Sequence, residues 1–386
     1  MIRLLLLIDS STEFSRQFLK RFINYTKDKG SWTFFRLPAY YRALYGEQGI
    51  LAWIQAWKID AVIAQWEYED VSFLEKLKIP VFLQNYKDEN ICCSKITGEY
   101  KQVGTMAAQF FIKKRFRNFA FYGHKDFYWS RARAEGYRKE IEKIGGNYHY
   151  FESELLNNNS WSEDHIRLND WLVSLPKPVG LFACDDIFAL QVSEMCKISE
   201  INIPKELSLL GVDNDELICS LTYPSISSIV TDDFKGGYET GRMLHHQIVN
   251  KKNVPFNISI APTRIELRQS TEKYNITDDN ILKVVNYIEE NISLNIAVDN
   301  LVTIVPLSRR NLELKFKEIM GTTVYQFILD SKIDFIKDQL LTTDKDILDI
   351  AFEAGFNDVR NVYRVFKKGT GFTPMEFRKN LNQFVG

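Results

Sequence analysis

The spacing of apolar positions divides the chain into two parts. Over residues 2–262, short continuous apolar runs alternate with segments in which apolar residues recur every three to four positions. The continuous runs predict buried strands of a parallel sheet, and the periodic segments predict helices on both of its faces. Two such alternations follow one another, so we expect two α/β lobes rather than a single sheet. The predicted strands are residues 2–8, 32–37, 61–64, 81–83, 119–122, 179–184 and 207–212.

The second part of the chain follows a helical pattern throughout. Residues 268–277 are polar and predict a linker, and from residue 281 onward the apolar positions recur with helical spacing. We therefore expect a two-lobe α/β effector domain over residues 1–267 and an all-α double helix-turn-helix domain over residues 278–386.

Length and composition agree with a globular protein of more than one domain. The chain has 386 residues, 45% of them hydrophobic and 26% charged, and a net charge of −1. The apolar run at residues 4–8 is too short for a signal-peptide core or a membrane span. Five scattered cysteines fit no zinc spacing and suggest free thiols in a reducing compartment. We expect a cytoplasmic protein that needs no cofactor or metal.

Polar clusters stand at strand ends in the first part, where open α/β sheets bind ligands. One strand ends in Asp185 and Asp186, and the next ends in Asp213 and Asn214. Carboxylates, amides and arginine bind sugar hydroxyls in pairs, and an aromatic ring packs on the apolar face of a sugar. For each residue alone, a helix cap or a surface loop is the alternative. The predicted effector-binding residues are Arg133, Asp213, Asn214, Asp185, Asp186, Trp129, Phe127 and Asp9.

Two short helices with a glycine between them are predicted in residues 344–379. Asp346 and Asp358 stand at the two N-cap positions, and Gly355 stands where the first helix ends in a left-handed residue. The second helix has a buried aliphatic stripe and a basic, amide-bearing outer face, which fits a major groove. Its predicted DNA-binding residues are Val359, Arg360, Asn361, Tyr363, Arg364 and Lys367.

A similar motif lies upstream, where Ser308 can cap a second reading helix. Glu313 on this helix could accept a hydrogen bond from cytosine N4 or could be a solvated charge, and both interpretations stay open. A helix over about residues 324–340 fits between the two motifs and can hold both readers one turn apart on one side of a duplex. The predicted DNA-binding residues of this motif are Ser308, Arg309, Arg310, Glu313 and Lys317.

Charge in the helical domain is sorted rather than uniform. Residues 276–386 hold 14 Lys or Arg and 16 Asp or Glu, a net charge of −2, whereas a DNA-binding domain is normally basic. The basic side chains gather in residues 308–317 and 358–368, and the acidic ones lie mostly in the helices between, such as Asp330, Asp334 and Asp338. Local basic faces on an acidic body favour specific over non-specific DNA binding.

The two helical motifs resemble the paired helix-turn-helix motifs of the AraC family of transcription regulators. Residues 347–378 carry the run I-x-x-I-A-x-x-x-G-F-x-D-x-x-x-V-x-R-x-F-K-K-x-x-G-x-T-P-x-x-F-R, which has more than a dozen typed positions at fixed spacing. The upstream motif departs from the family pattern, because Pro306 replaces a usual glycine and Val302 a usual alanine. The resemblance implies sequence-specific binding to double-stranded DNA.

The α/β part resembles the LacI-type periplasmic-binding-protein fold, through R-x-x-G-Y, an N-D-like pair and G-x-D-N. In that family the three corresponding residues contact the effector, which implies this role for Arg133, Asp185 and Asp213. Asp185 departs from the usual asparagine. This fold followed by an AraC-type domain is similar to the XylR group of pentose-responsive regulators, which implies a xylose-like effector.

Two other classes of protein are the alternatives to a regulator. A sugar-processing enzyme would need a catalytic constellation, but the chain has no glycine-rich phosphate loop, no G-x-S-x-G and no H-E-x-x-H, and the Asp185–Asp186 pair lacks a third partner. A transport-type sugar-binding protein would need an export signal, and it would not need the C-terminal helices.

The sequence therefore predicts a cytoplasmic, sugar-responsive transcription regulator that activates pentose catabolism genes. We expect the effector to close the two lobes and to shift the chain towards a DNA-competent state. The expected partners are double-stranded DNA, a pentose, RNA polymerase and a second copy of the chain, with no membrane contact.

Overall fold

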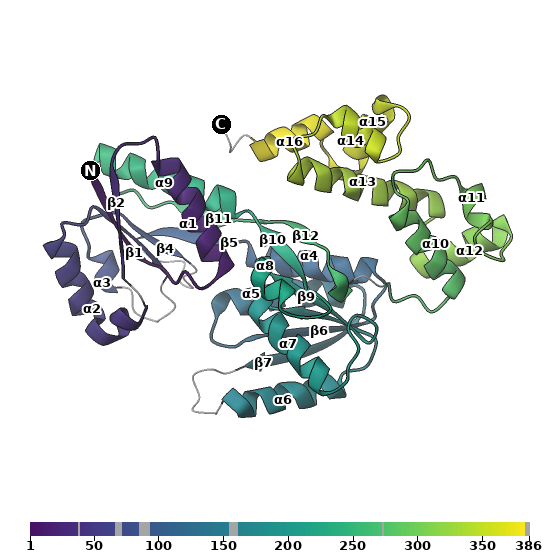
Figure 1. The fold of residues 1–386 in the computed structure, drawn as a ribbon, viewed down its shortest axis with the longest axis horizontal. Coiled ribbons are helices and arrows are strands. Elements are labelled where there is room, and N and C mark those ends of the chain that lie inside the picture. The colour runs from purple at the N-terminus through teal and green to yellow at the C-terminus, as the bar shows by residue number, and fades with distance from the viewer. Residues whose placement is uncertain (38, 66–71, 85–92, 154–160, 272–273, 383–386) are drawn as a thin grey trace. The chain divides into compact units, whose positions relative to one another are not determined.

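The structure is a computed structural model, and it describes every residue except 38, 66–71, 85–92, 154–160, 272–273 and 383–386. The chain forms two compact units, Met1–Lys273 and Tyr274–Gly386 (Figure 1). The strands of the described residues all belong to the first unit, and the second unit is helical.

The first lobe of the α/β unit is a parallel sheet with the strand order β11-β5-β4-β3-β1-β2. Successive residues of β1 enter opposite cores, Leu5 and Leu7 on one face and Leu4 and Leu6 on the other, because side chains alternate along a strand. The bounds are β1 (Ile2–Leu7), β2 (Trp32–Arg36), β3 (Ala61–Gln65), β4 (Val81–Gln84), β5 (Ser94–Gly98), β11 (Asn257–Ile260), α1 (Glu13–Thr26), α2 (Ala39–Ala56), α3 (Ser72–Glu75) and α9 (Asp233–Asn250).

The second lobe has the strand order β12-β10-β9-β8-β6-β7, and only β12 runs antiparallel to its neighbour. The strands β8 and β9 are buried along their whole length, as expected for strands covered on both faces. The bounds are β6 (Asn118–His124), β7 (Asn147–Ser153), β8 (Val179–Ala183), β9 (Leu207–Val212), β10 (Ser227–Thr231), β12 (Pro262–Glu266), α4 (Tyr100–Lys113), α5 (Tyr128–Lys143), α6 (Trp161–Ser174), α7 (Asp186–Ile198) and α8 (Glu216–Ser220).

The chain passes between the lobes three times, after β5, after β10 and after β11. Each lobe is therefore assembled from segments that are far apart in the sequence. Every predicted strand is present, and β5, β7, β10, β11 and β12 are additional strands. Two α/β lobes with parallel sheets, followed by a helical unit, confirm the predicted fold class.

Two glycines bring α4 and α5 into close contact in the second lobe. A Cβ on Gly104 would lie 2.0 Å from the carbonyl oxygen of Arg133, and a Cβ on Gly136 would lie 2.0 Å from that of Lys101. Only glycine allows two helix backbones to approach this closely. This packing fixes the segment of α5 that carries Arg133.

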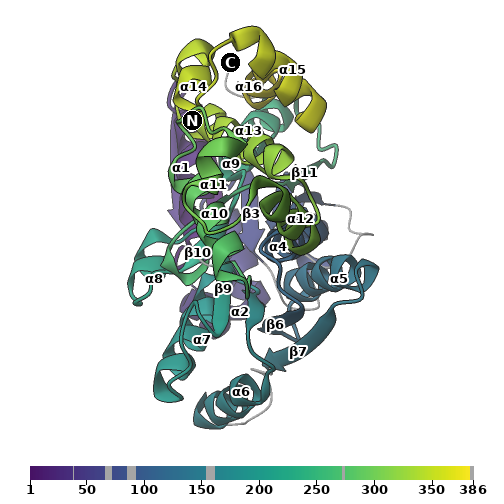
Figure 2. The same cartoon turned by 90° about the vertical axis from the view of Figure 1, so that its right-hand side faces the viewer.

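The helical unit has two separate cores that share one long helix, α13 (Val324–Thr342). Figures 1 and 2 show α10, α11 and α12 gathered at one end of α13 and α14, α15 and α16 at the other. The remaining bounds are α10 (Asp279–Glu290), α11 (Val298–Val302), α12 (Arg309–Met320), α14 (Ile347–Glu353), α15 (Val359–Thr370) and α16 (Pro374–Asn382).

The range 268–277, predicted as a linker, contributes to both units. Ser270 is fully buried in the second lobe, where its hydroxyl donates to the carbonyl of Leu209 at 2.6 Å. Tyr274 and Ile276 are buried in the first core of the helical unit. The predicted linker is therefore hydrogen-bonded to the second lobe before residue 272, and it packs into the first core of the helical unit after residue 273.

The described cysteines, Cys93, Cys184, Cys196 and Cys219, are all buried, and Cys184, Cys196 and Cys219 are free thiols. Among the described residues no cluster of His, Cys, Asp or Glu could hold a metal ion. No helix in the described part of the chain combines the length and the apolarity that a membrane crossing requires.

Candidate functional site

A cavity of about 280 Å³ lies between the two lobes of the α/β unit. The three chain crossings border it, since Gly98, Thr231 and Ile260 are among its lining residues. Most of the predicted effector-binding residues also line it, although they come from separate strand ends and loops. These are Asp9, Phe127, Trp129, Arg133, Asp185 and Asp213.

Arg133 is the buried cation of the cavity. Only 5% of the residue is exposed, and its guanidinium donates to the carbonyl of Cys184 and to Asp213 Oδ1, the latter at 3.3 Å. The guanidinium carbon lies 5.1 Å from the ring centroid of Trp129 and 5.7 Å from that of Tyr100, within the range of cation–π attraction. Its Nε has no partner among the described residues, so one donor remains for a ligand.

Asp213 is placed by an unusual turn at the end of β9. Its φ is 92° and that of Asn214 is 52°, and both values lie in the left-handed region that few non-glycine residues adopt. The surrounding structure holds this turn, because the Asp213 amide donates to the carbonyl of Ile229 at 2.9 Å. Backbone strain of this kind gathers at ligand sites, and here it accompanies a carboxylate that lines the cavity.

Asp185 is both a helix cap and a cavity residue. Its Oδ1 accepts from the amide of Phe188 at 2.8 Å at the start of α7. Burial, together with the nearby charge of Asp213, raises the pKa of this carboxyl to about 6, against the lowering effects of the Phe188 amide and of Arg133. Asp185 can therefore cap α7 and contact a ligand in the same conformation.

An aromatic wall completes the second-lobe side of the cavity. The rings of Phe127 and Trp129 are stacked, with centroids 5.2 Å apart and planes 13° apart. Phe127 also lies 4.2 Å from the ring of His124. Such a wall offers the flat apolar contact that one face of a sugar ring needs.

The first lobe contributes mainly uncharged polar groups. Asp9 accepts from the amide and the hydroxyl of Ser11, each at 2.9 Å, and its own amide donates to Gln65 Oε1 at 3.3 Å. Ser11, Gln65 and Gln84 all line the cavity beside it.

Gln84 was missed by sequence reasoning, although it ends the buried strand β4. It is fully buried, and neither atom of its amide group has a hydrogen-bond partner among the described residues. An unsatisfied buried polar group costs about 1–3 kcal/mol, so a ligand with hydroxyl groups would relieve this cost. The strand-end rule that found Asp185 and Asp213 would also have found Gln84.

The structure corrects the prediction for Asp186 and Asn214, because neither lines the cavity. Asp186 is buried in the second lobe and accepts from the Ser228 hydroxyl at 2.6 Å and from the Asp215 amide at 2.7 Å. The side-chain oxygen of Asn214 accepts from Arg268 at 2.8 Å. Both residues stabilise the turn that positions Asp213.

In the helical unit, α12 forms the first candidate DNA-reading surface. Ser308 caps it and accepts from the amide of Asn311 at 3.3 Å. Arg309 is held by Asp299 of α11 at 2.8 Å and by Glu313 at 3.3 Å. Arg309 therefore links two helices of its own motif, whereas Arg310 makes no such pair in the described structure.

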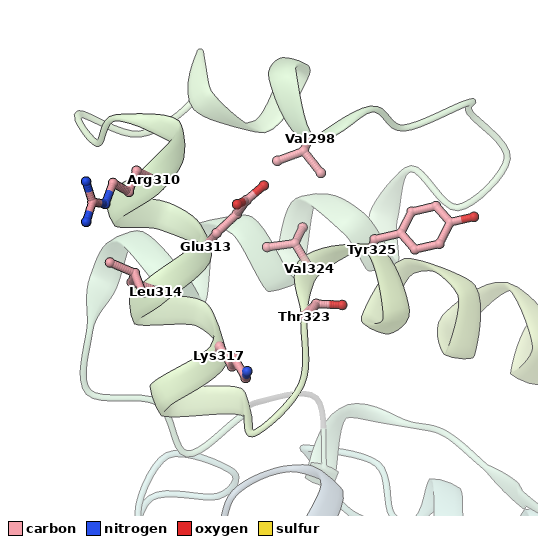
Figure 3. Close-up of a pocket in the computed structure, with 8 residues that line it drawn as sticks. All are labelled: Val298, Arg310, Glu313, Leu314, Lys317, Thr323, Val324 and Tyr325. Carbon is pink, nitrogen blue, oxygen red and sulfur yellow. The ribbon is translucent and has the colours of Figure 1, made fainter.

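Four residues of α12 line one side of a groove of about 430 Å³ (Figure 3). They recur with helical spacing, so they share one face of the helix. Leu314 on this face was missed by sequence reasoning: it is 59% exposed and can contact a thymine methyl group. The four residues are Arg310, Glu313, Leu314 and Lys317.

The second candidate reading helix, α15, is capped by Asp358, which accepts from the amide of Arg360 at 2.9 Å. This bond and the nearby Arg360 side chain lower the pKa of Asp358. The Arg360 side chain is 93% exposed, and Arg364 donates to the side-chain oxygen of Asn361 at 3.0 Å. A polar, solvent-facing surface is what base reading requires.

Val359, Tyr363 and Lys367 differ in position on the same helix. Val359 is partly buried and packs against the second core of the helical unit, and its role as a DNA-binding residue stays a prediction. Tyr363 is half-buried, and Lys367 is exposed near the C-terminal end of α15.

Both parts of the chain match known protein families. A periplasmic binding protein-like domain matches residues 108–271, and a helix-turn-helix domain matches residues 301–380. The xylose operon regulatory protein of Haemophilus influenzae is 33% identical over 280 residues, which cover 71% of this chain and 72% of that protein. The chain belongs to the family of xylose operon regulatory proteins. The family member of Escherichia coli K12 is 31% identical over 273 residues, 69% of each chain.

A solved structure extends the match within this family over almost the whole chain. The xylose-binding transcription activator xylR is 25% identical, with a TM-score of 0.60, and the match covers 98% of this chain and 97% of that chain. Family membership confirms the prediction of a sugar-responsive, DNA-binding transcription regulator. The relatives are transcription regulators, not members of either alternative class.

Proposed function

We propose that the inter-lobe cavity binds an aldopentose, with D-xylose as the first candidate, and that its occupancy controls operator binding by α12 and α15. One observation carries this proposal. Side chains from separate strand ends converge on one cavity, where buried atoms of Gln84 and Arg133 have no hydrogen-bond partner among the residues that the structure describes. Xylose is named first because the relatives are xylose operon regulators.

The chemistry of the cavity suits a small polyhydroxylated ring. Asp185 and Asp213 accept from hydroxyl groups, Arg133 donates, and Gln84 can do both. Trp129 and Phe127 supply an apolar wall. Since the lining comes from both lobes, a bound sugar favours the closed arrangement of the lobes and shifts the population of states by its differential affinity.

The remaining parts of the proposal concern partners and place of action. The chain acts as an activator of pentose catabolism genes, contacts RNA polymerase at the promoter and binds its operator as a homodimer. It works without catalysis and in the cytoplasm, where its target DNA lies. The activator role is supported by the similarity to xylR, which is a xylose-binding transcription activator.

A thermal melt of the full chain against a panel of pentoses and hexoses tests the effector. A ligand that binds only the folded state raises the melting temperature by mass action. We expect millimolar D-xylose to raise it more than other sugars do. If no pentose or hexose moves the melt, the sugar proposal is wrong.

Footprinting of the full chain tests the DNA-binding part of the proposal. Two reading helices that dock in successive major-groove segments should protect two regions about 34 Å apart along the duplex. Protection of a single segment would show that α12 is only scaffold.

A further inference from the structure

A buried lysine lies at the junction between the two cores of the helical unit. Lys332 stands in the middle of α13 and is only 4% exposed. The residues of α13 before it, such as Phe327 and Ile328, belong to the first core, and those after it, such as Ile333 and Ile336, belong to the second. Lys332 therefore lies where α13 passes from the core of the first helix-turn-helix motif to the core of the second.

The ammonium group of Lys332 connects the two motifs directly. It donates to the carbonyl of Leu294, in the loop before α11, at 3.1 Å. It also donates to the carbonyl of Gly355, in the turn between α14 and α15, at 2.8 Å. The ring centroid of Phe356 lies 4.9 Å away, within cation–π range. One side chain thus joins the first motif, the shared helix and the turn of the second motif.

The backbone around Gly355 is shaped for this contact. Gly355 has a φ of 66°, and a Cβ there would lie 2.6 Å from the Leu294 carbonyl oxygen, 2.7 Å from that of Ser293 and 2.7 Å from Lys332 Nζ. The loop of the first motif therefore packs against the turn of the second with no room for a side chain. A glycine is required here both by conformation and by space.

Hydrophobic packing alone does not explain a lysine at this position. Burial lowers the pKa of Lys332 to about 8, which reflects the cost of placing an ammonium group away from water. A methionine would fill similar space without that cost, but it could not donate to two carbonyl groups. The lysine therefore adds directional bonds between the loop of the first motif and the turn of the second, which also pack against each other.

We propose that Lys332 is a positioning residue that sets the orientation of α12 relative to α15, and so the spacing of the two DNA segments the chain reads. This inference rests on the proposed function, in which both helices read one duplex. A duplex requires two readers at a fixed separation and rotation. A bridge between the motifs holds that geometry before DNA is bound, so binding the second segment costs little further ordering.

The test measures spacing preference with the full chain. Operator duplexes carry zero, one or two extra base pairs between the two protected segments, and affinity is measured by fluorescence anisotropy. We expect the wild type to discriminate strongly against the insertions. Lys332→Met should bind the unaltered operator about tenfold more weakly and should lose most of this discrimination. A loss of stability alone would weaken all the duplexes alike.

The matched control is Lys337→Met, on the same helix. The Lys337 side chain is 35% exposed and forms an ion pair with Asp334 at 3.2 Å. We expect wild-type affinity and wild-type spacing preference from this variant. A folded Lys332→Met chain that shares both properties would overturn the inference.

A second variant decides the question if Lys332→Met does not fold. Lys332→Arg keeps donors for both carbonyl groups, and we expect a folded chain with the wild-type spacing preference. A folded Lys332→Arg chain that has lost the preference contradicts the inference. A wild-type chain that tolerates all insertions would instead refute the two-helix reading, and the inference would fall with it.

Discussion

Polar side chains differ in burial and in pairing between the cavity of the α/β unit and the reading surface of the helical unit. In the cavity, Arg133 and Gln84 are buried, and each has side-chain atoms without a hydrogen-bond partner in the described part of the chain. On the reading helices, Arg309 and Arg360 are exposed, and each pairs with acids of its own motif.

This difference determines how much each site should lose when a side chain is removed. A buried group without water depends on its ligand for hydrogen bonds, so its removal has a large effect. An exposed ion pair contributes little by itself, and its residue matters only for the base that it contacts. The following variants test this contrast, from the largest expected effect to the smallest.

Asp213→Ala should give the largest loss. A carboxylate that accepts from sugar hydroxyls in a closed cavity should contribute about 1.5–3 kcal/mol to effector binding, the range for hydrogen bonds to charged groups. Calorimetry with D-xylose measures the change, and DNA binding without sugar should stay intact. Asp170→Ala, on the exposed face of α6, is the control. Equal sugar affinity in both variants would place the site elsewhere.

Arg360→Ala should weaken operator binding by roughly 1–3 kcal/mol if Arg360 contacts a guanine. Base preference should relax only at the base pair that Arg360 contacts, because the other contacts of α15 remain. Affinities for a set of single-substitution operators show whether choice relaxes at that base pair alone. A uniform loss across all sequences would assign Arg360 to a phosphate.

Gln84→Leu should act on stability and binding in opposite directions. Replacing a buried unsatisfied amide by an apolar group of similar size removes a desolvation cost, so the sugar-free chain should gain about 1–2 kcal/mol in free energy of unfolding. Sugar affinity should fall at the same time. Denaturant unfolding and calorimetry measure the two effects, and Gln55→Leu on an exposed position of α2 is the control. Lower stability together with unchanged affinity would contradict this account of Gln84.

Asp185 should make effector binding depend on pH. Its pKa of about 6 means that a sugar hydroxyl which donates to the ionised carboxylate binds about tenfold better at pH 7 than at pH 5. In the sugar-free chain the raised pKa has the opposite consequence. This carboxyl stabilises the fold fully below its unfolded pKa of 3.8, and the contribution is lost as the pH rises through about 6.

Calorimetry at several pH values compares the wild type with Asp185→Asn. The amide does not titrate, so the pH dependence should disappear in the variant. If the variant keeps it, another group is responsible.

Sequence reasoning found the charged residues and the aromatic wall of the cavity, and it missed the buried amide of Gln84. Asp185 and Asp213 follow long apolar strands, so their position at a sheet edge can be read locally. Gln84 ends the buried strand β4, so the same rule could have found it, but only the structure shows that its amide is fully buried. Asp186 carries the same local signal as Asp185, and only the tertiary contact with Ser228 shows that it faces the fold.

Several strands escaped prediction for a related reason. In β10 the buried residues Ser227 and Ser228 interrupt the apolar pattern, and their hydroxyls are satisfied by distant partners, among them Asp186 and Thr271. The strands β11 and β12 belong to different lobes, and each follows a crossing of the chain between the lobes. The local sequence pattern does not indicate such crossings. Lys332 looks like a surface residue in a helical segment, since its two carbonyl partners lie 38 and 23 residues away.

The central claim is that a sugar in the inter-lobe cavity controls DNA binding. The most direct measurement is the affinity of the full chain for its footprinted operator, with and without saturating D-xylose, in the wild type and in Asp213→Ala. The account predicts that xylose changes the wild-type affinity, and that the same xylose concentration has a much smaller effect on the variant. An operator affinity of the wild type that is identical with and without xylose would contradict it.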